Sequence, residues 1–82
     1  MLNDKIAIVT GIGYAVAQAL RQEGAQVVMA DVNEALLRES ARKLGGVPFV
    51  GNLTKREDCR QLVDFTAQRF GRVDILANVA GV

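Results

Sequence analysis

The sequence predicts an α/β domain built on a parallel sheet, because two kinds of segment alternate along it. Four short apolar runs rich in β-branched residues fit strands covered on both faces. Three segments between them carry apolar residues at helical spacing and end at glycines. The resulting order, β-α-β-α-β-α-β, implies right-handed crossovers and the strand order 3-2-1-4.

The first three elements follow directly from these patterns. Residues 5–10, KIAIVT, form a continuous apolar run and are predicted to be a buried strand. Residues 14–24 have apolar side chains at positions i, i+3 and i+4, and Gly24 is placed to end that helix. Residues 25–31, AQVVMAD, form the second short strand, which ends in Asp31.

The next helix and strand lie in residues 33–52. Asn33 is expected to cap a helix that ends at two glycines. One apolar stripe is predicted along this helix, formed by Leu36, Leu37, Ser40, Ala41 and Leu44. The strand VPFVGN follows, and Pro48 places it at an edge or at a strand start because proline lacks an N–H group.

The last helix and strand complete the pattern. Thr54 and Glu57 have the spacing of a capping box, and Gly71 is expected to end the helix that they open. Its predicted stripe consists of Cys59, Leu62, Val63, Thr66 and Phe70. Residues 72–81 are predicted to be the fourth strand, with Asp74 facing solvent or capping its start.

Composition excludes several functional classes. Half of the 82 residues are hydrophobic and the formal net charge is +1, which is typical of a globular domain and argues against a nucleic-acid binder. The chain has no histidine and a single cysteine, Cys59, so neither a zinc site nor an internal disulfide is expected. No apolar window reaches the roughly 20 residues of a membrane span. We therefore expect a cytoplasmic protein with no membrane partner.

A glycine turn links the first strand to the first helix. Thr10, Gly11, Ile12 and Gly13 stand where a backbone can approach a pyrophosphate, and the helix that follows offers its free N–H groups to the anion. The alternative is a tight turn that needs glycine only for steric reasons.

Asp31 favours the nucleotide-binding interpretation. It ends the second strand, 18 residues after Gly13, where an acid can accept hydrogen bonds from both hydroxyls of an adenosine ribose. The same carboxylate repels a 2′-phosphate, so NAD is the expected cofactor rather than NADP. The alternative is an aspartate that caps a helix on a solvated loop.

The segments VTGIGYAVAQAL, VVMAD, GNLT and VDILANVAGV together resemble the N-terminal half of the short-chain dehydrogenase/reductase family, over residues 5–82. The resemblance implies a Rossmann-like fold, NAD(P)-dependent hydride transfer on an alcohol or ketone, and a homo-oligomer. It also implies cofactor contacts for the glycine turn, the end of the second strand, the segment after the third strand and the end of the fourth. The residues are Gly11, Ile12, Gly13, Asp31, Val32, Asn52, Leu53, Asn78, Ala80 and Gly81.

Three departures from the family pattern matter. The family loop reads T-G-x-x-x-G-x-G, whereas this chain has T-G-I-G and lacks four residues that curl over the pyrophosphate. Asn52 stands where the family often has Asp, and its amide oxygen could still accept from the adenine amino group. Val79 replaces the second Asn of N-N-A-G, a side chain that ties the central strands together in the family.

The family's catalytic Ser and its Y-x-x-x-K pair have no counterpart in these residues. Gln18 stands four residues after Tyr14, the only tyrosine, and Ser40, the only serine, lies on the second helix. No general acid/base pair can be assembled from them at neutral pH, so no catalytic residue is predicted and the 82 residues alone are expected to be inactive.

Three interpretations fit these observations. In the first, residues 1–82 are the NAD-binding N-terminal half of a Rossmann domain, and the parent is an NAD-dependent dehydrogenase. In the second, the chain is a fragment or half-domain with a shortened loop, without the C-terminal half. In the third, it is a scaffold that associates with itself through the open edge of its fourth strand.

Overall fold

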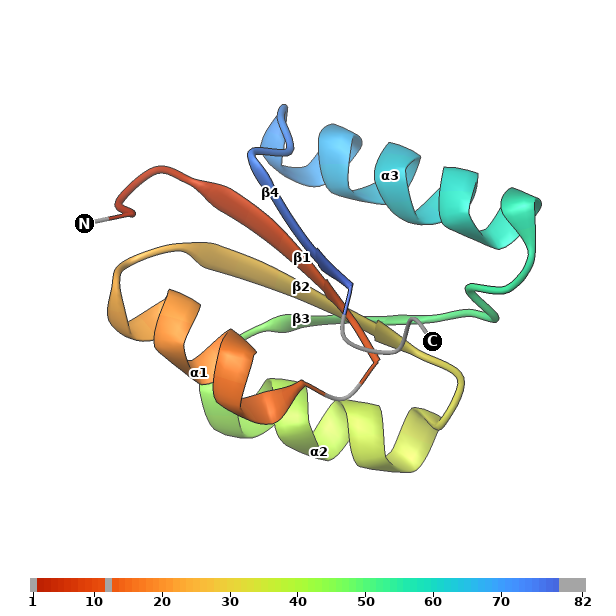
Figure 1. Ribbon diagram of the computed structural model, residues 1–82, viewed down its shortest axis with the longest axis horizontal. Helices are drawn as coiled ribbons and strands as arrows, with labels where there is room; N and C mark the ends of the chain where they lie inside the picture. The colour runs from red at the N-terminus through yellow and green to blue at the C-terminus, as the bar shows by residue number, and fades with distance from the viewer. Residues whose placement is uncertain (1, 12, 79–82) are drawn as a thin grey trace.

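A computed structural model describes residues 2–11 and 13–78 of the protein, and four strands and three helices alternate in this part of the chain (Figure 1). They are β1 (Ile6–Thr10), α1 (Tyr14–Gln22), β2 (Gln26–Asp31), α2 (Glu34–Leu44), β3 (Val47–Val50), α3 (Arg56–Phe70) and β4 (Ile75–Asn78). The strands form one parallel sheet in the order β3-β2-β1-β4, which confirms the predicted order.

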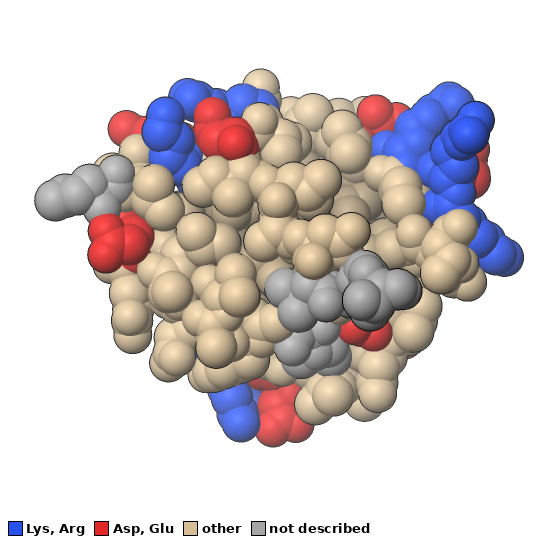
Figure 2. Space-filling model, in the orientation of Figure 1, with Lys and Arg blue, Asp and Glu red and all other residues tan. Residues whose placement is uncertain are grey.

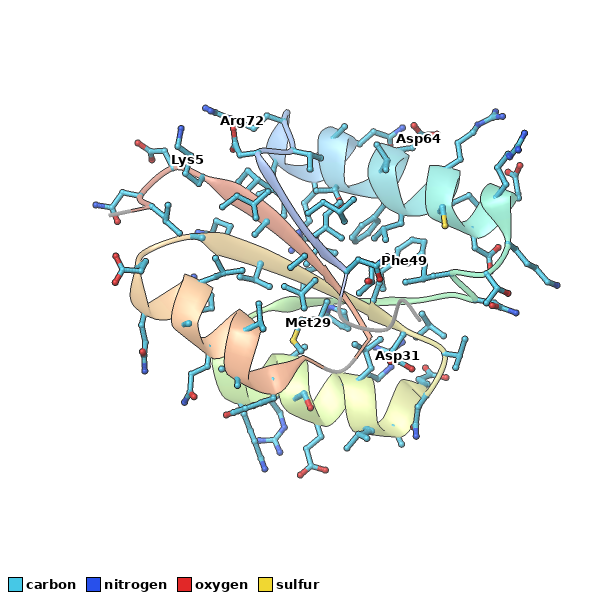
Figure 3. The ribbon with its side chains drawn as sticks, in the orientation of Figure 1. Lys5, Met29, Asp31, Phe49, Asp64 and Arg72 are labelled. Atoms are coloured by element: carbon cyan, nitrogen blue, oxygen red, sulfur yellow. The ribbon has the colours of Figure 1, made fainter. Side chains whose placement is uncertain are left out.

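The sheet lies between two layers of helices (Figure 1). Helices α1 and α2 cover one face, and α3 covers the other. Because side chains alternate along a strand, Val9 and Met29 pack toward α1 and α2, whereas Ile8 and Val28 pack toward Leu62 of α3. Figure 3 shows Met29 and Phe49 on these opposite faces. The two central strands are therefore almost fully buried, as their apolar runs predict.

The two outer strands are more exposed than the central pair. Val47 to Phe49 of β3 are half-buried, and β3 pairs only with β2 among the described strands, so Pro48 lies on an edge as predicted. On β4, Leu76 is 66% exposed. The fourth strand is shorter than expected: residues 72–74 are outside it, and residues 79–81 lie outside the described part of the chain.

Most predicted helix ends are confirmed. The Asn33 side chain accepts from the Leu36 N–H at 3.2 Å and caps α2. Gly45 and Gly71 follow α2 and α3 in the left-handed conformation, which a residue without Cβ adopts at little cost. After the end of α1, Gly24 also has a positive φ, 100°.

The predicted capping box at Thr54 and Glu57 is wrong. Helix α3 is preceded by Lys55, which makes no side-chain capping bond. Thr54 instead donates its hydroxyl to Asn52 Oδ1 at 2.6 Å, because the nearby amide oxygen offers a local acceptor that competes with the helix end. The carboxylate of Glu57 accepts from Gln61 on the exposed face of α3.

Two residues of the predicted apolar stripes also lie outside the core. Leu36 and Val63 are each about half exposed, although their neighbours Leu37 and Leu62 are buried. Neither residue belongs to the two core clusters of the described part of the chain. No helix in the described part of the chain is both long and apolar enough to cross a membrane.

Asp74 binds the start of β1 to the chain segment before β4. Its Oδ2 accepts from the Ile6 N–H at 2.9 Å, and its own N–H donates to the Ile6 carbonyl at 2.8 Å. Arg72 pairs with Oδ1 at 2.8 Å. The Arg72 guanidinium, followed by the Ile6 N–H, lowers the pKa of the Asp74 carboxyl. Asp74 is therefore an exposed residue, as the first expectation had it, and its carboxylate caps the start of β1 rather than the start of the fourth strand.

Candidate functional site

A cleft with a volume of about 490 Å³ opens at the carboxyl ends of the strands, between the sheet and α3. Each strand brings a polar side chain to this end. Thr10, Asp31 and Asn78 are the last residues of β1, β2 and β4, and Asn52 follows β3 closely. In open parallel sheets, ligands bind outside the carboxyl ends of the strands. The polar residues expected from the sequence are thus brought together by topology.

The other end of the cleft is apolar. It runs along the face of the sheet that α3 covers, between Leu62 and Val63 on the helix and the outer strand β4. Leu76 and Val73 contribute side chains there and are both partly exposed. The cleft therefore has one polar end, which suits a ligand group that forms hydrogen bonds, and one apolar end.

The glycine turn lies at the polar end. Gly11 has φ 74° and donates its N–H to the Ala30 carbonyl at 2.7 Å, so a residue with a Cβ would be strained there. Gly13 precedes α1 directly and offers no side chain to cap it. The positive end of the α1 dipole therefore begins immediately after the turn. Ile12, which was expected to contact the cofactor, lies outside the described residues.

Asp31 is half-buried at the end of β2 and lines the cleft (Figure 3). Its Oδ1 accepts from the Asn33 N–H at 3.0 Å. An ionised carboxylate has about four acceptor sites, so this bond leaves capacity for ligand hydroxyls. The same bond holds the backbone of Asn33, the residue that caps α2. The Asp31 carboxylate therefore supports the start of this helix and also faces the cleft. Val32, beside it, is exposed and also lines the cleft.

The segment after β3 forms another wall, which includes Asn52, Leu53 and Thr54. Asn52 Oδ1 accepts from both the N–H of Thr54, at 3.1 Å, and its hydroxyl, at 2.6 Å. The amide oxygen expected to accept from adenine thus already accepts two bonds. The amide nitrogen, Nδ2, is the donor that this side chain could turn toward a ligand.

Asp58 was not identified from the sequence, yet it supports this wall. Its Oδ2 accepts from the Asn52 backbone N–H at 2.7 Å. Asp58 is the third residue of α3, and an acid at that position commonly reaches back to a backbone N–H before the helix. That position was the available signal. It was missed because Thr54 and Glu57 offered the more familiar spacing.

Asn78 stands at the end of β4 and lines the cleft, as expected. Its Oδ1 accepts from the Thr10 hydroxyl at 2.9 Å. Ala80 and Gly81, the other expected residues of this segment, lie outside the described part of the chain, as does Val79. Ser40 is buried in α2, whose core face packs on the side of the sheet opposite α3. Ser40 is not among the residues that line the cleft.

Comparison with known proteins identifies the family. Residues 6–82 match a family model described as enoyl-(acyl carrier protein) reductase. The chain is 37% identical to zerumbone synthase of Zingiber zerumbet, with 99% of this chain and 33% of that protein covered. It is 44% identical to L-fucose dehydrogenase of Bos taurus, over 94% of this chain and 30% of that protein.

A solved structure agrees with the sequence comparisons. Glucose dehydrogenase of Caenorhabditis elegans, in its apo form, superposes with a TM-score of 0.88 at 29% identity and covers 98% of this chain and 39% of its own. The chain spans about a third of the length of the curated relatives that it matches. Strand order, polar cleft and sequence similarity agree, and the chain belongs to the short-chain dehydrogenase/reductase family.

Proposed function

We propose that these residues form the NAD-binding part of an oxidoreductase that transfers hydride between the cofactor and a small alcohol or ketone. The observation that carries the proposal is the position of Asp31, half-buried at the end of β2 in the same cleft as Gly11. A carboxylate and a glycine turn at neighbouring strand ends match, respectively, the ribose and the pyrophosphate of an adenosine diphosphate group.

The residues of the cleft fit such a group. The Gly11 turn and the start of α1 are suited to the pyrophosphate, because glycine allows close approach and the helix offers N–H groups. Asp31 is suited to the ribose hydroxyls, with Val32 against the sugar. Asn52 and Leu53 border the space for adenine, and Asn78 with Ala80 and Gly81 would continue the site past β4. When bound, the nicotinamide would accept or supply the hydride.

Charge supports NAD over NADP. A 2′-phosphate on the ribose would meet the Asp31 carboxylate, and the described lining of the cleft contains no lysine or arginine to offset that repulsion. On the face shown in Figure 2, the visible lysine and arginine side chains lie near the edge of the molecule. An NADP site would be expected to place a cation at this position.

The rest of the reaction requires groups outside these residues. The alcohol or ketone substrate, the general acid/base and the homo-oligomer are proposals for the parent enzyme, and the 82 residues alone are proposed to be inactive. A single cysteine suits a reducing compartment, so we propose the cytoplasm as its location.

Calorimetric titration of the 82-residue protein with NAD and NADP tests the proposal. We expect NAD to bind more tightly, and its addition to shift the amide resonances of Gly11 and Asp31 in a two-dimensional NMR spectrum. If millimolar NAD left both resonances unchanged and shifted others, the cleft would not be the cofactor site.

The exposed edge of β4 favours a second candidate function, a self-associating scaffold. Leu76 is 66% exposed on this edge strand, and an uncovered strand edge can pair with another chain. Size-exclusion chromatography with and without NAD separates the two functions. A dimer whose stability does not change when NAD is added would support the scaffold. Binding of NAD by a monomer or a dimer would support the nucleotide-binding module.

A further inference from the structure

The wall of the cleft formed by residues 51–54 is held by α3 rather than by the sheet alone. Gly51 donates its N–H to the Asp31 carbonyl at 3.0 Å, which is the last bond from the wall to β2. Beyond it, the Asn52 N–H donates to Asp58 Oδ2 at 2.7 Å, and the Cys59 thiol donates to the Leu53 carbonyl at 3.2 Å. Two adjacent side chains of the first turn of α3 thus fix two consecutive residues of the wall.

Asp58 makes the stronger of these two links. A hydrogen bond to an ionised carboxylate is shorter and about twice as strong as one between neutral groups, whereas a thiol is a weak donor. The side chain also lies beside the wall, since a Cβ placed on Gly51 would be in ordinary van der Waals contact with the Cβ of Asp58, at 3.7 Å.

The position of the Asn52 side chain depends on this link. Its Oδ1 is held by the N–H and hydroxyl of Thr54, so the amide is fixed relative to its own loop. The bond from its backbone to Asp58 ties that loop to α3, together with the weaker thiol contact and the Lys55 N–H, which donates to the Asn52 carbonyl at 3.0 Å. Loss of the carboxylate would remove the charged link between the wall and the helix.

We propose that Asp58 is a positioning residue for the adenosine part of the cofactor. This inference rests on the proposed function. Asp58 does not line the cleft; it holds Asn52 and Leu53 in the wall that faces the same cleft as Asp31. An unsupported wall would have to be ordered each time the cofactor binds, which weakens affinity.

The test compares Asp58→Ala with Asp64→Ala, which removes the same charge from an exposed position on the same helix (Figure 3). Asp58→Asn, which keeps an acceptor oxygen without the charge, is the conservative variant. Calorimetry with NAD and with AMP is carried out where denaturation shows each variant to be folded. We expect Asp58→Ala to bind both ligands about fivefold more weakly, Asp58→Asn to recover part of the loss, and Asp64→Ala to match the wild type.

A spectroscopic measurement separates positioning from general stability. In the wild-type protein we expect the Asn52 amide proton to resonate downfield and to exchange slowly with solvent. In Asp58→Ala it should move upfield while the Gly11 amide stays in place. Equal affinities of Asp58→Ala and Asp64→Ala would overturn the inference alone. Failure of the wild-type protein to bind either ligand would overturn the proposed function and the inference with it. If Asp58→Ala does not fold, the comparison of Asp58→Asn with Asp64→Ala decides in the same way.

Discussion

The hydroxyl of Thr10 donates to Asn78 Oδ1 at 2.9 Å, across the last paired residues of β1 and β4. Thr10 is 8% exposed, so the bond lies at the boundary between the buried sheet and the cleft. It holds the carboxyl end of the edge strand against the centre of the sheet. The first and last strands are therefore joined at the point where the proposed cofactor site begins.

We expect Thr10→Val to destabilise the protein by about 1 kcal/mol, because valine keeps the shape of threonine but leaves the Asn78 amide oxygen without its donor. Thr66→Val is the matched control. The Thr66 hydroxyl donates to the Leu62 carbonyl, which already accepts a helix bond, so its loss should cost less. Urea denaturation measures both. A smaller effect at position 10 than at position 66 would show that the link between the strands contributes little.

Asp74 should make stability depend on pH in acid. Arg72 and the Ile6 N–H lower the pKa of its carboxyl, so its contribution to stability is present above the pKa of the unfolded chain. The contribution is lost as the pH falls through the lowered pKa of the folded state. We expect Asp74→Asn to be less stable than the wild type at neutral pH and to lose less stability on acidification.

Asp64→Asn, an exposed substitution on α3, is the control for that measurement. Thermal unfolding at a series of pH values from neutral to strongly acidic compares the three proteins. If Asp74→Asn and Asp64→Asn gave parallel curves, the Arg72–Asp74–Ile6 contacts would not be the source of the acid dependence.

Asp31→Ala should weaken NAD binding about tenfold, since the ribose hydroxyls lose a charged acceptor. Binding of NADP should fall less or improve, because the repulsion of its 2′-phosphate disappears at the same time. Calorimetric dissociation constants for both cofactors give the ratio. Glu34→Ala, three residues further along and exposed, controls for the change in net charge. Equal losses of affinity for the two cofactors would mean that Asp31 does not recognise the ribose hydroxyls.

Inserting four residues between Thr10 and Gly11 should tighten NAD binding, because it restores the loop length of the family and adds backbone N–H donors for the pyrophosphate. The same four residues inserted after Gly71, where open space surrounds the turn, provide the control. Unchanged affinity in the first variant would show that loop length does not limit binding.

Local signals predicted the helix ends well where the partner was close in sequence. Asn33 caps α2 through a bond that spans three residues, and Gly45 and Gly71 adopt the left-handed conformation that their positions indicated. Thr54 shows the limit of the same reasoning. Its spacing to Glu57 fitted a capping box, but the Asn52 amide oxygen accepted its hydroxyl instead. Sequence spacing shows which hydrogen-bond partners are available but does not show which of them forms the bond.

The sequence by itself determined the order of the elements, the central position of β1 and β2, and the set of polar residues at the strand ends. Hydrophobic periodicity and strand-ending residues carry that information, because they report which face of each element is buried. Tertiary structure alone decided that Thr10 meets Asn78 and that Ile6 meets Asp74, each pair 68 residues apart. It also brought the Asp58 carboxylate to the Asn52 backbone N–H. These contacts depend on the register between strands and on the approach of α3 to the sheet, and a one-dimensional pattern specifies neither.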